Sequence, residues 1–261
     1  MKTTLLTLCF FLSLGILSAQ EQPVVMEWIV DGETRQALAY IPASAKTGPT
    51  PVVFAFHGHG GTMHRAFQQR NFHQLWPESI FICPQGLNTP GLLTDPEGKK
   101  SGWVMDDKTD ANRDIQFVDA MLKTVRANYK IDNSRVYATG HSNGGGFTYL
   151  LWALRANEFA AFAPTATAAG KLVNRLIPKP VLHLMGENDP LVKPVMQKMT
   201  CNRVLKLNEC EKEGKPIGKN ITFYAGKNGN DVTLYIHNEG HQYPNEANRI
   251  IIDFFKKYPK K

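Results

Sequence analysis

Apolar and polar positions follow two different periods along the chain. Short, continuously apolar runs such as 51–56 are typical of strands that are buried on both faces of a sheet. Other segments place apolar residues three and four positions apart, as Ile115, Val118 and Leu122 do, which is typical of one face of an amphipathic helix. Because such strands and helices alternate, the chain is predicted to be an α/β protein, with a mainly parallel sheet covered by helices on both faces.

The same pattern predicts where the elements lie. Strands are expected at 24–30, 35–41, 51–56, 80–83, 136–139, 159–164, 180–185 and 232–236. Helices are expected at 64–76, 115–129, 143–155, 195–207 and 247–255. Asp31 and Gly32 form a turn dipeptide between the first two strands, so these two strands should form a hairpin. A loop rich in glycine, proline and charge is expected at 85–110.

The first nineteen residues have the composition of a secretory signal peptide. Lys2 precedes an apolar stretch from Leu5 to Leu17, and the small residue Ala19 stands where a peptidase would cut. The alternative is an uncleaved anchor, but the apolar run is shorter than the ~20 residues of a spanning helix. We therefore expect a signal peptide at 1–19, a single catalytic domain at 20–261, and a secreted or periplasmic protein that is not attached to a membrane.

Charge and cysteine content narrow the classes of partner. The formal net charge is +7, but the basic residues are scattered and form no patch interleaved with aromatic residues, so no nucleic-acid partner is expected. The sequence contains neither a CxxC nor an HExxH motif, so no metal site is expected. Cys83, Cys201 and Cys210 lie beyond the signal peptide, and the sequence leaves open whether Cys201 and Cys210 form a disulfide.

A candidate nucleophile lies between a predicted strand and a predicted helix. Residues 140–144 read Gly-His-Ser-Asn-Gly and match GxSxG, in which Ser142 occupies a sharp strand-to-helix turn. The flanking glycines are needed there because side chains would collide with the neighbouring strand and helix. The alternative is a glycine-rich turn that carries no catalytic residue. It is less favoured because the motif lies between a predicted strand and a predicted helix.

A serine needs a base, and three histidines follow Ser142 in the chain. His241 precedes Tyr243 in a predicted loop and is the first choice, with His237 at a strand end as the reserve. His183 lies inside an apolar run and is expected to be a core residue. The order serine, acid, histidine is the one that this turn motif usually accompanies.

The acid of the predicted triad should lie between these two residues. Asp189 follows a predicted core strand, at the edge of the sheet where ligand-facing residues gather, and is the first choice. Glu187 is the reserve. The alternative is that these acids are only turn residues before Pro190. That interpretation is credible for Asp189 or for Glu187 when each is taken alone.

Two further groups of residues are expected beside the nucleophile. The backbone N–H groups of Asn143 and of a residue near His59 should form the oxyanion hole. Four other residues are predicted to contact substrate: His57, Gly60, His141 and Trp103. His57 and His59 could also pack within their loop or bind a metal, but no third ligand is in view. The aspartates at 106, 107, 110 and 114 are expected to be solvated or to cap a helix.

With these residues, the chain resembles the esterase D-like and polyhydroxybutyrate depolymerase-like branch of the α/β-hydrolases, which includes secreted feruloyl esterases of carbohydrate esterase family 1. The motifs that carry the resemblance lie at 56–61, 114–118, 135–145, 159–164, 186–190 and 240–244. The resemblance implies the α/β-hydrolase fold, the same triad and the same oxyanion loop. Many relatives have a cysteine or another small residue at the position of His59, and tryptophan at the position of Tyr243.

The expected reaction is ester hydrolysis through an acyl-enzyme, without a cofactor. Feruloyl or acetyl esters of plant polysaccharide are the favoured substrates, and poly(3-hydroxybutyrate) or short hydroxyalkanoate esters are the alternative. An acyltransferase with the same triad is a more distant alternative, as are a non-catalytic binding protein and a serine peptidase. The acyl group, the alcohol and the oligomeric state stay open at this point.

Overall fold

The computed structural model describes residues 21–91, 93–105 and 112–260. The predicted signal peptide at 1–19 lies outside the described residues, as do Asp106, Asp107 and Asp110. Within those ranges, no helix combines the length and the apolar character that a membrane span requires.

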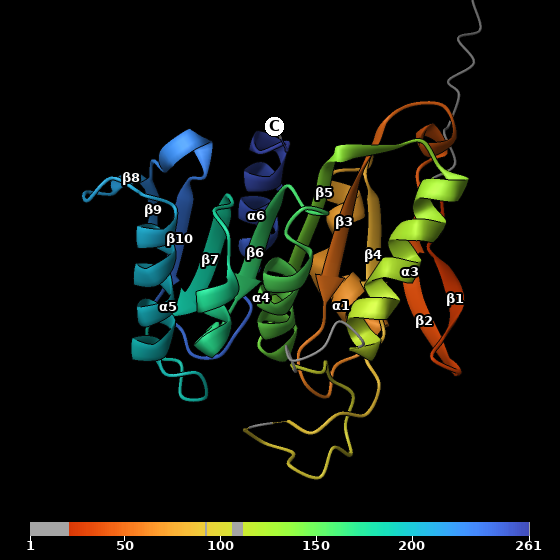
Figure 1. Cartoon of the computed structure of the whole chain (residues 1–261), viewed down its shortest axis with the longest axis horizontal. Helices are drawn as coiled ribbons and strands as arrows, with labels where there is room; N and C mark the ends of the chain where they lie inside the picture. Colours follow the sequence, from red (N-terminus) through yellow and green to blue (C-terminus); the bar gives the residue numbers. More distant parts are fainter. Residues whose placement is uncertain (1–20, 92, 106–111, 261) are drawn as a thin grey trace, which may run out of the picture.

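The described strands form one mixed sheet (Figure 1). Their order across the sheet is β1-β2-β4-β3-β5-β6-β7-β10-β9-β8. The strands β4, β3, β5, β6, β7 and β10 run parallel to one another, while β1, β2, β9 and β8 pair antiparallel at the two sides. The strands are β1 (Val24–Val30), β2 (Glu33–Tyr40), β3 (Thr50–Phe56), β4 (Ile80–Pro84), β5 (Ile131–His141), β6 (Ala161–Thr165), β7 (Val181–Gly186), β8 (Lys215–Gly218), β9 (Ile221–Tyr224) and β10 (Val232–His237).

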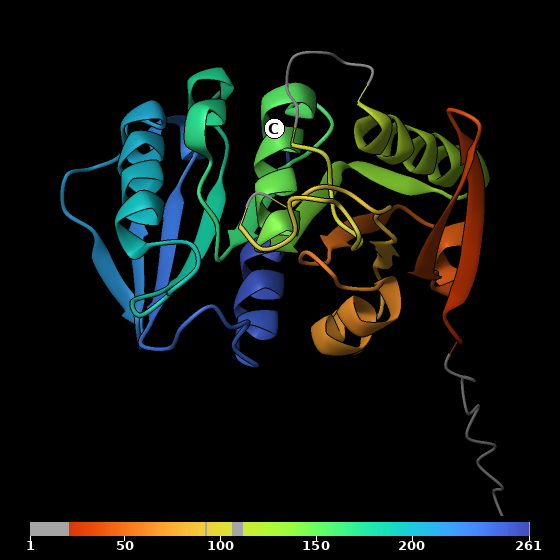
Figure 2. The ribbon, with the colours of Figure 1, turned by 90° about the horizontal axis from the view of Figure 1, so that it is seen from below.

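Helices cover both faces of the sheet, as the alternation of elements predicts. The α-helices are α1 (Met63–Arg70), α2 (Phe72–Leu75), α3 (Arg113–Asn128), α4 (Asn143–Arg155), α5 (Pro194–Leu207) and α6 (Ala247–Lys257). Short 3-10 turns lie at η1 (Ala43–Lys46), η2 (Gly170–Arg175) and η3 (Lys227–Gly229). Figure 2 shows α3, α4 and α5 on one face and α1 and α6 on the other.

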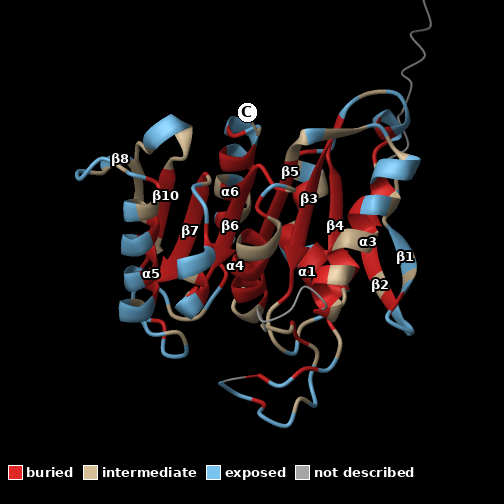
Figure 3. Ribbon diagram, in the orientation of Figure 1, coloured by how far each residue is buried: buried red, intermediate tan, exposed pale blue. Residues whose placement is uncertain are grey.

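Each face carries its own apolar core because side chains alternate along the central strands. In β3, Phe54 and Phe56 point to the core beneath α3, α4 and α5, while Val53 and Ala55 point to the other core. On the second face, the ring of Tyr137 in β5 stacks on Phe255 of α6 at 4.7 Å. The central strands β3, β4, β6 and β7 are buried throughout, and the outer helix faces are exposed (Figure 3).

The predicted strands and helices are present, with two main differences. The expected helix at 64–76 is divided at Asn71, whose φ of 49° is left-handed and ends α1. The strands β8 and β9 are absent from the sequence prediction, because each is only four residues long. Cys201 and Cys210, whose pairing the sequence left open, are both free thiols.

The fold brings loops from distant parts of the chain to one edge of the sheet. The carboxyl ends of the parallel strands meet there, at the lower edge in Figure 1, and the long loop at 85–105 projects from it. Ser142, Asp189 and His241 lie just after β5, β7 and β10. The candidate site is therefore at this edge, where open α/β sheets usually bind their ligands.

Candidate active site

Ser142 occupies a strained turn between β5 and α4. Its backbone has φ 56° and ψ −118°, a conformation that side-chain-bearing residues rarely adopt. A Cβ at Gly140 would collide with the carbonyl oxygen of Gly144, and a Cβ at Gly144 would collide with that of Phe56. The two glycines of the motif are therefore required by close backbone packing, which holds the serine hydroxyl at the tip of the turn.

The three residues of the predicted triad meet in one hydrogen-bonded line. His241 Nε2 lies 2.8 Å from Ser142 Oγ, and His241 Nδ1 lies 2.8 Å from Asp189 Oδ2. Because a carboxylate only accepts, Nδ1–H donates to Asp189 and Nε2 is left to accept from the serine hydroxyl. This is the arrangement in which an imidazole can remove the proton of an attacking serine.

Asp189 is buried and held by four donors. Its Oδ1 accepts the backbone N–H groups of Leu191 and Val192, each at 2.9 Å. Its Oδ2 accepts from Gln197 Nε2 at 3.1 Å in addition to His241. These hydrogen bonds fix the position of the carboxylate and offset the free-energy cost of burying its charge away from water.

A chain of buried polar side chains continues behind Asp189. Gln197 Oε1 lies 3.3 Å from His183 Nε2, and His183 Nδ1 lies 2.9 Å from the hydroxyl of Tyr149. The amide N–H groups of Gln197 donate to Asp189 and Val192, so its oxygen accepts from His183 Nε2–H. The hydroxyl of Tyr149 then donates to His183 Nδ1. His183 is a core residue, as predicted, but the sequence pattern gave no sign of its polar partners.

The reserve residues do not contact Ser142. Glu187 is exposed to solvent. His237 is 3% exposed, and its Nδ1 is buried without a hydrogen-bond partner among the described residues. Neither side chain forms a hydrogen bond with Ser142 or His241 in that part of the chain.

The glycine-rich loop after β3 passes beside the nucleophile. A Cβ at Gly58 would lie 3.6 Å from the Cβ of Ser142. In the described ranges, the backbone N–H groups of His59 and Asn143 donate to no protein acceptor. These two predicted donors therefore remain available, which is what an oxyanion hole requires.

The side chain of His59 is clamped by the long loop at 85–105. Its Nε2 lies 3.0 Å from Asp95 Oδ2, and Asp95 also accepts the backbone N–H groups of Lys99 and Lys100. Cβ atoms at Gly91 and Gly102 would lie within 2.9 Å of the imidazole. The ring thus fits a slot between two glycines and fixes the backbone that follows β3.

Trp103 does not line an acyl pocket, because it is fully buried. Its indole Nε1–H donates to the carbonyl oxygen of His57 at 2.8 Å, and its ring stacks on Phe147 at 5.1 Å. Its backbone N–H donates to Asn143 Oδ1 at 2.7 Å, and its carbonyl accepts from Asn143 Nδ2 at 3.2 Å. Trp103 therefore joins the two segments that carry the predicted oxyanion donors. A tryptophan in a glycine-rich loop gives no sequence signal of such burial.

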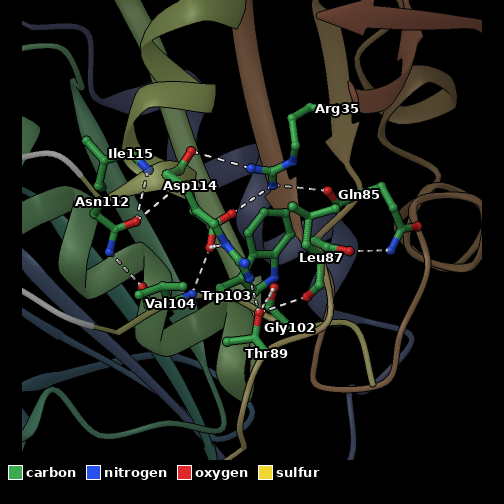
Figure 4. Close-up of polar contacts among 12 residues, drawn as sticks. Arg35, Gln85, Leu87, Thr89, Gly102, Trp103, Val104, Asn112, Asp114 and Ile115 are labelled. Carbon is green, nitrogen blue, oxygen red and sulfur yellow. Dashed lines mark hydrogen bonds and ion pairs between the residues drawn. The ribbon is translucent and has the colours of Figure 1, made fainter. Parts of the chain in front are cut away.

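A buried ion pair anchors the far end of this loop (Figure 4). Arg35 donates to Asp114 Oδ1 at 2.7 Å, and both side chains are buried. The other oxygen of Asp114 accepts the backbone N–H of Val104 at 2.8 Å. Asp114 is thus neither solvated nor the cap of α3, since Asn112 caps that helix through the N–H groups of Asp114 and Ile115.

The remaining predicted contact residues have mostly structural partners. His57 is 3% exposed, donates through Nδ1 to the carbonyl of Gly58, and accepts from Gly86 N–H at Nε2, which corresponds to loop packing. Burial lowers the pKa of His57 to about 4, so the ring is neutral. His141 lies 3.1 Å from the hydroxyl of Thr165, and its ring centroid is 5.1 Å from that of His241. No cluster of three potential metal ligands exists in the described part of the chain.

The fold of this chain is similar to that of several solved esterases. An acetyl xylan esterase from Aspergillus awamori superimposes with a TM-score of 0.69 at 15% identity, over 89% of this chain and 99% of that one. The chain has the α/β-hydrolase fold. A ferulic acid esterase also superimposes, with a TM-score of 0.62 at 12% identity, over 90% of this chain and 98% of that one. No family model matches the sequence.

Curated relatives of this α/β-hydrolase are similar over part of their length. A probable feruloyl esterase C of Aspergillus clavatus is 34% identical over 42% of this chain and 37% of its own length. Feruloyl esterase D of Neurospora crassa is 22% identical over 81% of this chain and 75% of its own length. The match spans less than half of each of the first three relatives, between 37% and 49% of their length. The sequence is thus similar, over part of its length, to proteins named feruloyl esterase.

A small cavity lies beside the triad of this α/β-hydrolase. Its volume is about 170 Å³, and it is bounded by the loop after β3, by α1 and by His141. His57, His59 and Gly60 line it together with His141, so these predicted residues do surround one space. The sequence analysis missed Arg65 and Arg70, which line the same cavity from α1.

Proposed function

We propose that this protein is an exported serine esterase, with Ser142 as the nucleophile, His241 as the general base and Asp189 as the residue that orients His241. The observation that carries the proposal is the unbroken hydrogen-bonded line from Ser142 Oγ through the imidazole to the buried carboxylate. The strained backbone at Ser142 supports it, because such turns are retained where they expose a reactive side chain.

In the proposed reaction, Ser142 Oγ attacks the carbonyl carbon of an ester while His241 Nε2 takes the hydroxyl proton. The resulting oxyanion accepts the backbone N–H groups of His59 and Asn143. His241 then gives the proton to the departing alcohol oxygen, and the acyl group stays on Ser142. A water molecule, deprotonated by His241, attacks this acyl-enzyme and releases the acid.

Feruloyl or acetyl esters of plant polysaccharide are the proposed substrates. Relatives named feruloyl esterase, and a bifunctional acetylxylan esterase/xylanase from Neocallimastix patriciarum that is 29% identical over 62% of this chain, support this choice. Short hydroxyalkanoate esters are the alternative. Export is proposed from the apolar stretch that precedes Ala19.

The test uses residues 20–261 with para-nitrophenyl acetate, methyl ferulate and a short 3-hydroxybutyrate ester. Ferulate release that the Ser142→Ala variant loses by at least about a thousandfold would support the feruloyl esterase. Ser44→Ala is the matched control, because Ser44 is exposed and should leave the rate unchanged. Hydrolysis of the hydroxybutyrate ester alone would favour the alternative. Rates in Ser142→Ala equal to those of the unaltered protein on all three substrates would refute the triad.

A further inference from the structure

The cavity beside the triad is lined by basic side chains and by no acid. Arg65 and Arg70 of α1 face it together with three histidines, and no aspartate or glutamate is among its described lining residues. His57 and His141 carry little of this charge, because burial lowers the pKa of His57 to about 4 and that of His141 well below the usual range, and His59 is already paired with Asp95. The positive charge of the cavity therefore belongs to the two arginines.

Arg70 is a buried cation without a carboxylate partner. Its side chain is 1% exposed, and no described aspartate or glutamate pairs with it. Among the described residues its Nε has no hydrogen-bond partner, and the guanidinium bonds only to uncharged side chains, to Gln69 Oε1 at 3.4 Å and to Tyr243. Arg35 is equally buried but pairs with Asp114 at 2.7 Å. Burying a charge without an opposite charge beside it costs free energy. A buried guanidinium that has no carboxylate partner is therefore suited to bind an anionic group of a ligand.

The aromatic ring beneath Arg70 holds it in place. The guanidinium carbon lies 3.6 Å from the ring centroid of Tyr243, whose hydroxyl donates to Asn248. A cation stacked in this way is oriented before any ligand arrives, and its planar N–H groups match the two oxygens of a carboxylate. Tyr243 follows His241 by two residues, so the same loop carries the catalytic base and the support of the cation.

The cavity adjoins the triad. His141 lines the cavity, and its ring centroid lies 5.1 Å from that of His241. Gly58 also lines the cavity, and a Cβ at this position would lie 3.6 Å from the Cβ of Ser142. One molecule can therefore place an acidic group at Arg70 and an ester carbonyl at Ser142.

We propose that Arg70, assisted by Arg65, forms a subsite for a carboxylate carried by the ester substrate. This inference rests on the proposed esterase function and narrows its substrates to esters that bear an acidic group on either the acyl or the alcohol half. Arg70 gives the charge-assisted hydrogen bonds inside the cavity, and the exposed Arg65 attracts the anion at the entrance.

Two pairs of substrates separate the acyl half from the alcohol half. The mono-para-nitrophenyl ester of succinate carries a carboxylate on the acyl side and is compared with para-nitrophenyl butyrate. The acetyl ester of 4-hydroxybenzoate carries it on the leaving group and is compared with that of 4-hydroxybenzamide. In at least one pair, the charged ester should have the higher kcat/KM.

The variants test whether the arginines cause this preference. Arg70→Met should lower the charged-to-neutral ratio of kcat/KM by about tenfold to a hundredfold, the effect of losing a charge-assisted hydrogen bond. Arg65→Gln should lower it less, because Arg65 is exposed. Arg203→Gln, an exposed arginine on α5, is the control and should leave the ratio unchanged. Because both esters are measured on the same sample, a loss of folded protein cancels from the ratio.

An unchanged ratio in both Arg70→Met and Arg65→Gln, for both pairs, would overturn the proposed subsite. The absence of any turnover would instead refute the esterase function. Binding then tests the subsite separately: calorimetry with the Ser142→Ala protein should show 4-hydroxybenzoate binding at least about tenfold more tightly than 4-hydroxybenzamide, and Arg70→Met should remove the difference. Equal affinities for the two ligands would contradict the proposal.

Discussion

Gln197 donates a hydrogen bond of 3.1 Å to Asp189 Oδ2, the same oxygen that accepts from His241 Nδ1. The amide also donates to the carbonyl of Val192, and it is completely buried. One side chain therefore fixes both the carboxylate and the turn that carries it.

Replacing Gln197 should impair turnover more than binding. In Gln197→Met the carboxylate loses a donor and the imidazole loses part of its orientation, so kcat should fall by about tenfold to a hundredfold while KM changes less than threefold. Steady-state kinetics on para-nitrophenyl acetate measure both constants. Gln68→Met, at an exposed position of α1, is the control. A rise in KM at unchanged kcat would show that Gln197 does not position the triad.

His183 should make the fold less stable in acid. Burial lowers its pKa to about 4, against about 6.5 in the unfolded chain. Above pH 6.5 the imidazole of His183 is neutral in both the folded and the unfolded state, so it does not change the free energy of unfolding. Between pH 6.5 and 4 only the unfolded chain takes up the proton, so the free energy of unfolding falls as the pH falls. At pH 5 this loss should be about 2 kcal/mol.

Urea denaturation at pH 7 and pH 5 measures this effect in the unaltered protein and in His183→Gln, whose amide can replace both hydrogen bonds. The decrease between the two pH values should be smaller in the variant by about 2 kcal/mol. Equal decreases in the two proteins would mean that His183 is protonated in the folded state.

Removing Asp114 should destabilise the fold strongly. Asp114→Ala leaves Arg35 buried without its partner and frees the Val104 N–H, which should lower the free energy of unfolding by about 3–5 kcal/mol. Glu158→Ala removes the partner of Arg126 in a pair that is about one third exposed, and should cost less than about 1 kcal/mol. Chemical denaturation compares the two, and similar losses would contradict the role given to the buried pair.

Gly144 should tolerate no side chain. Gly144→Ala places a Cβ against the carbonyl oxygens of Phe56 and His57, so either β3 or α4 must move. We expect a loss of about 3 kcal/mol in stability and a fall in kcat of at least about a hundredfold, because the Asn143 N–H moves with the helix. Gly48→Ala, which meets no atom within 4 Å, is the control. Full activity in Gly144→Ala would refute this account of the turn.

The sequence predicts the central part of the fold well because its strands and helices are long and strongly periodic. The helix at 143–155 has the predicted bounds, and the central parallel strands differ from the prediction mainly at their ends. The edge strands β8 and β9 could not be predicted, since each is only four residues long and is held by strand pairing, β9 with β10 and β8 with β9, rather than by a local pattern.

The candidate site was predictable only where a motif fixes the position of a residue. Ser142, Asp189 and His241 follow core strands, and the structure places them in hydrogen-bond contact; their catalytic role stays a prediction. The burial of Trp103 depends on contacts with residues forty or more positions away, which no local pattern records. That no described carboxylate pairs with Arg70 likewise follows from the folded structure and cannot be read from a local sequence pattern.

The composition of β8 also limits how molecules of this protein can associate. β8 is the outermost strand of the sheet on its side, and all four of its residues are exposed. Pro216 has no N–H to offer a further strand, and Lys215 adds a charge beside it. Proline and charge on an edge strand both disfavour pairing with a further strand, so this edge is protected against the strand-by-strand growth that leads to aggregation.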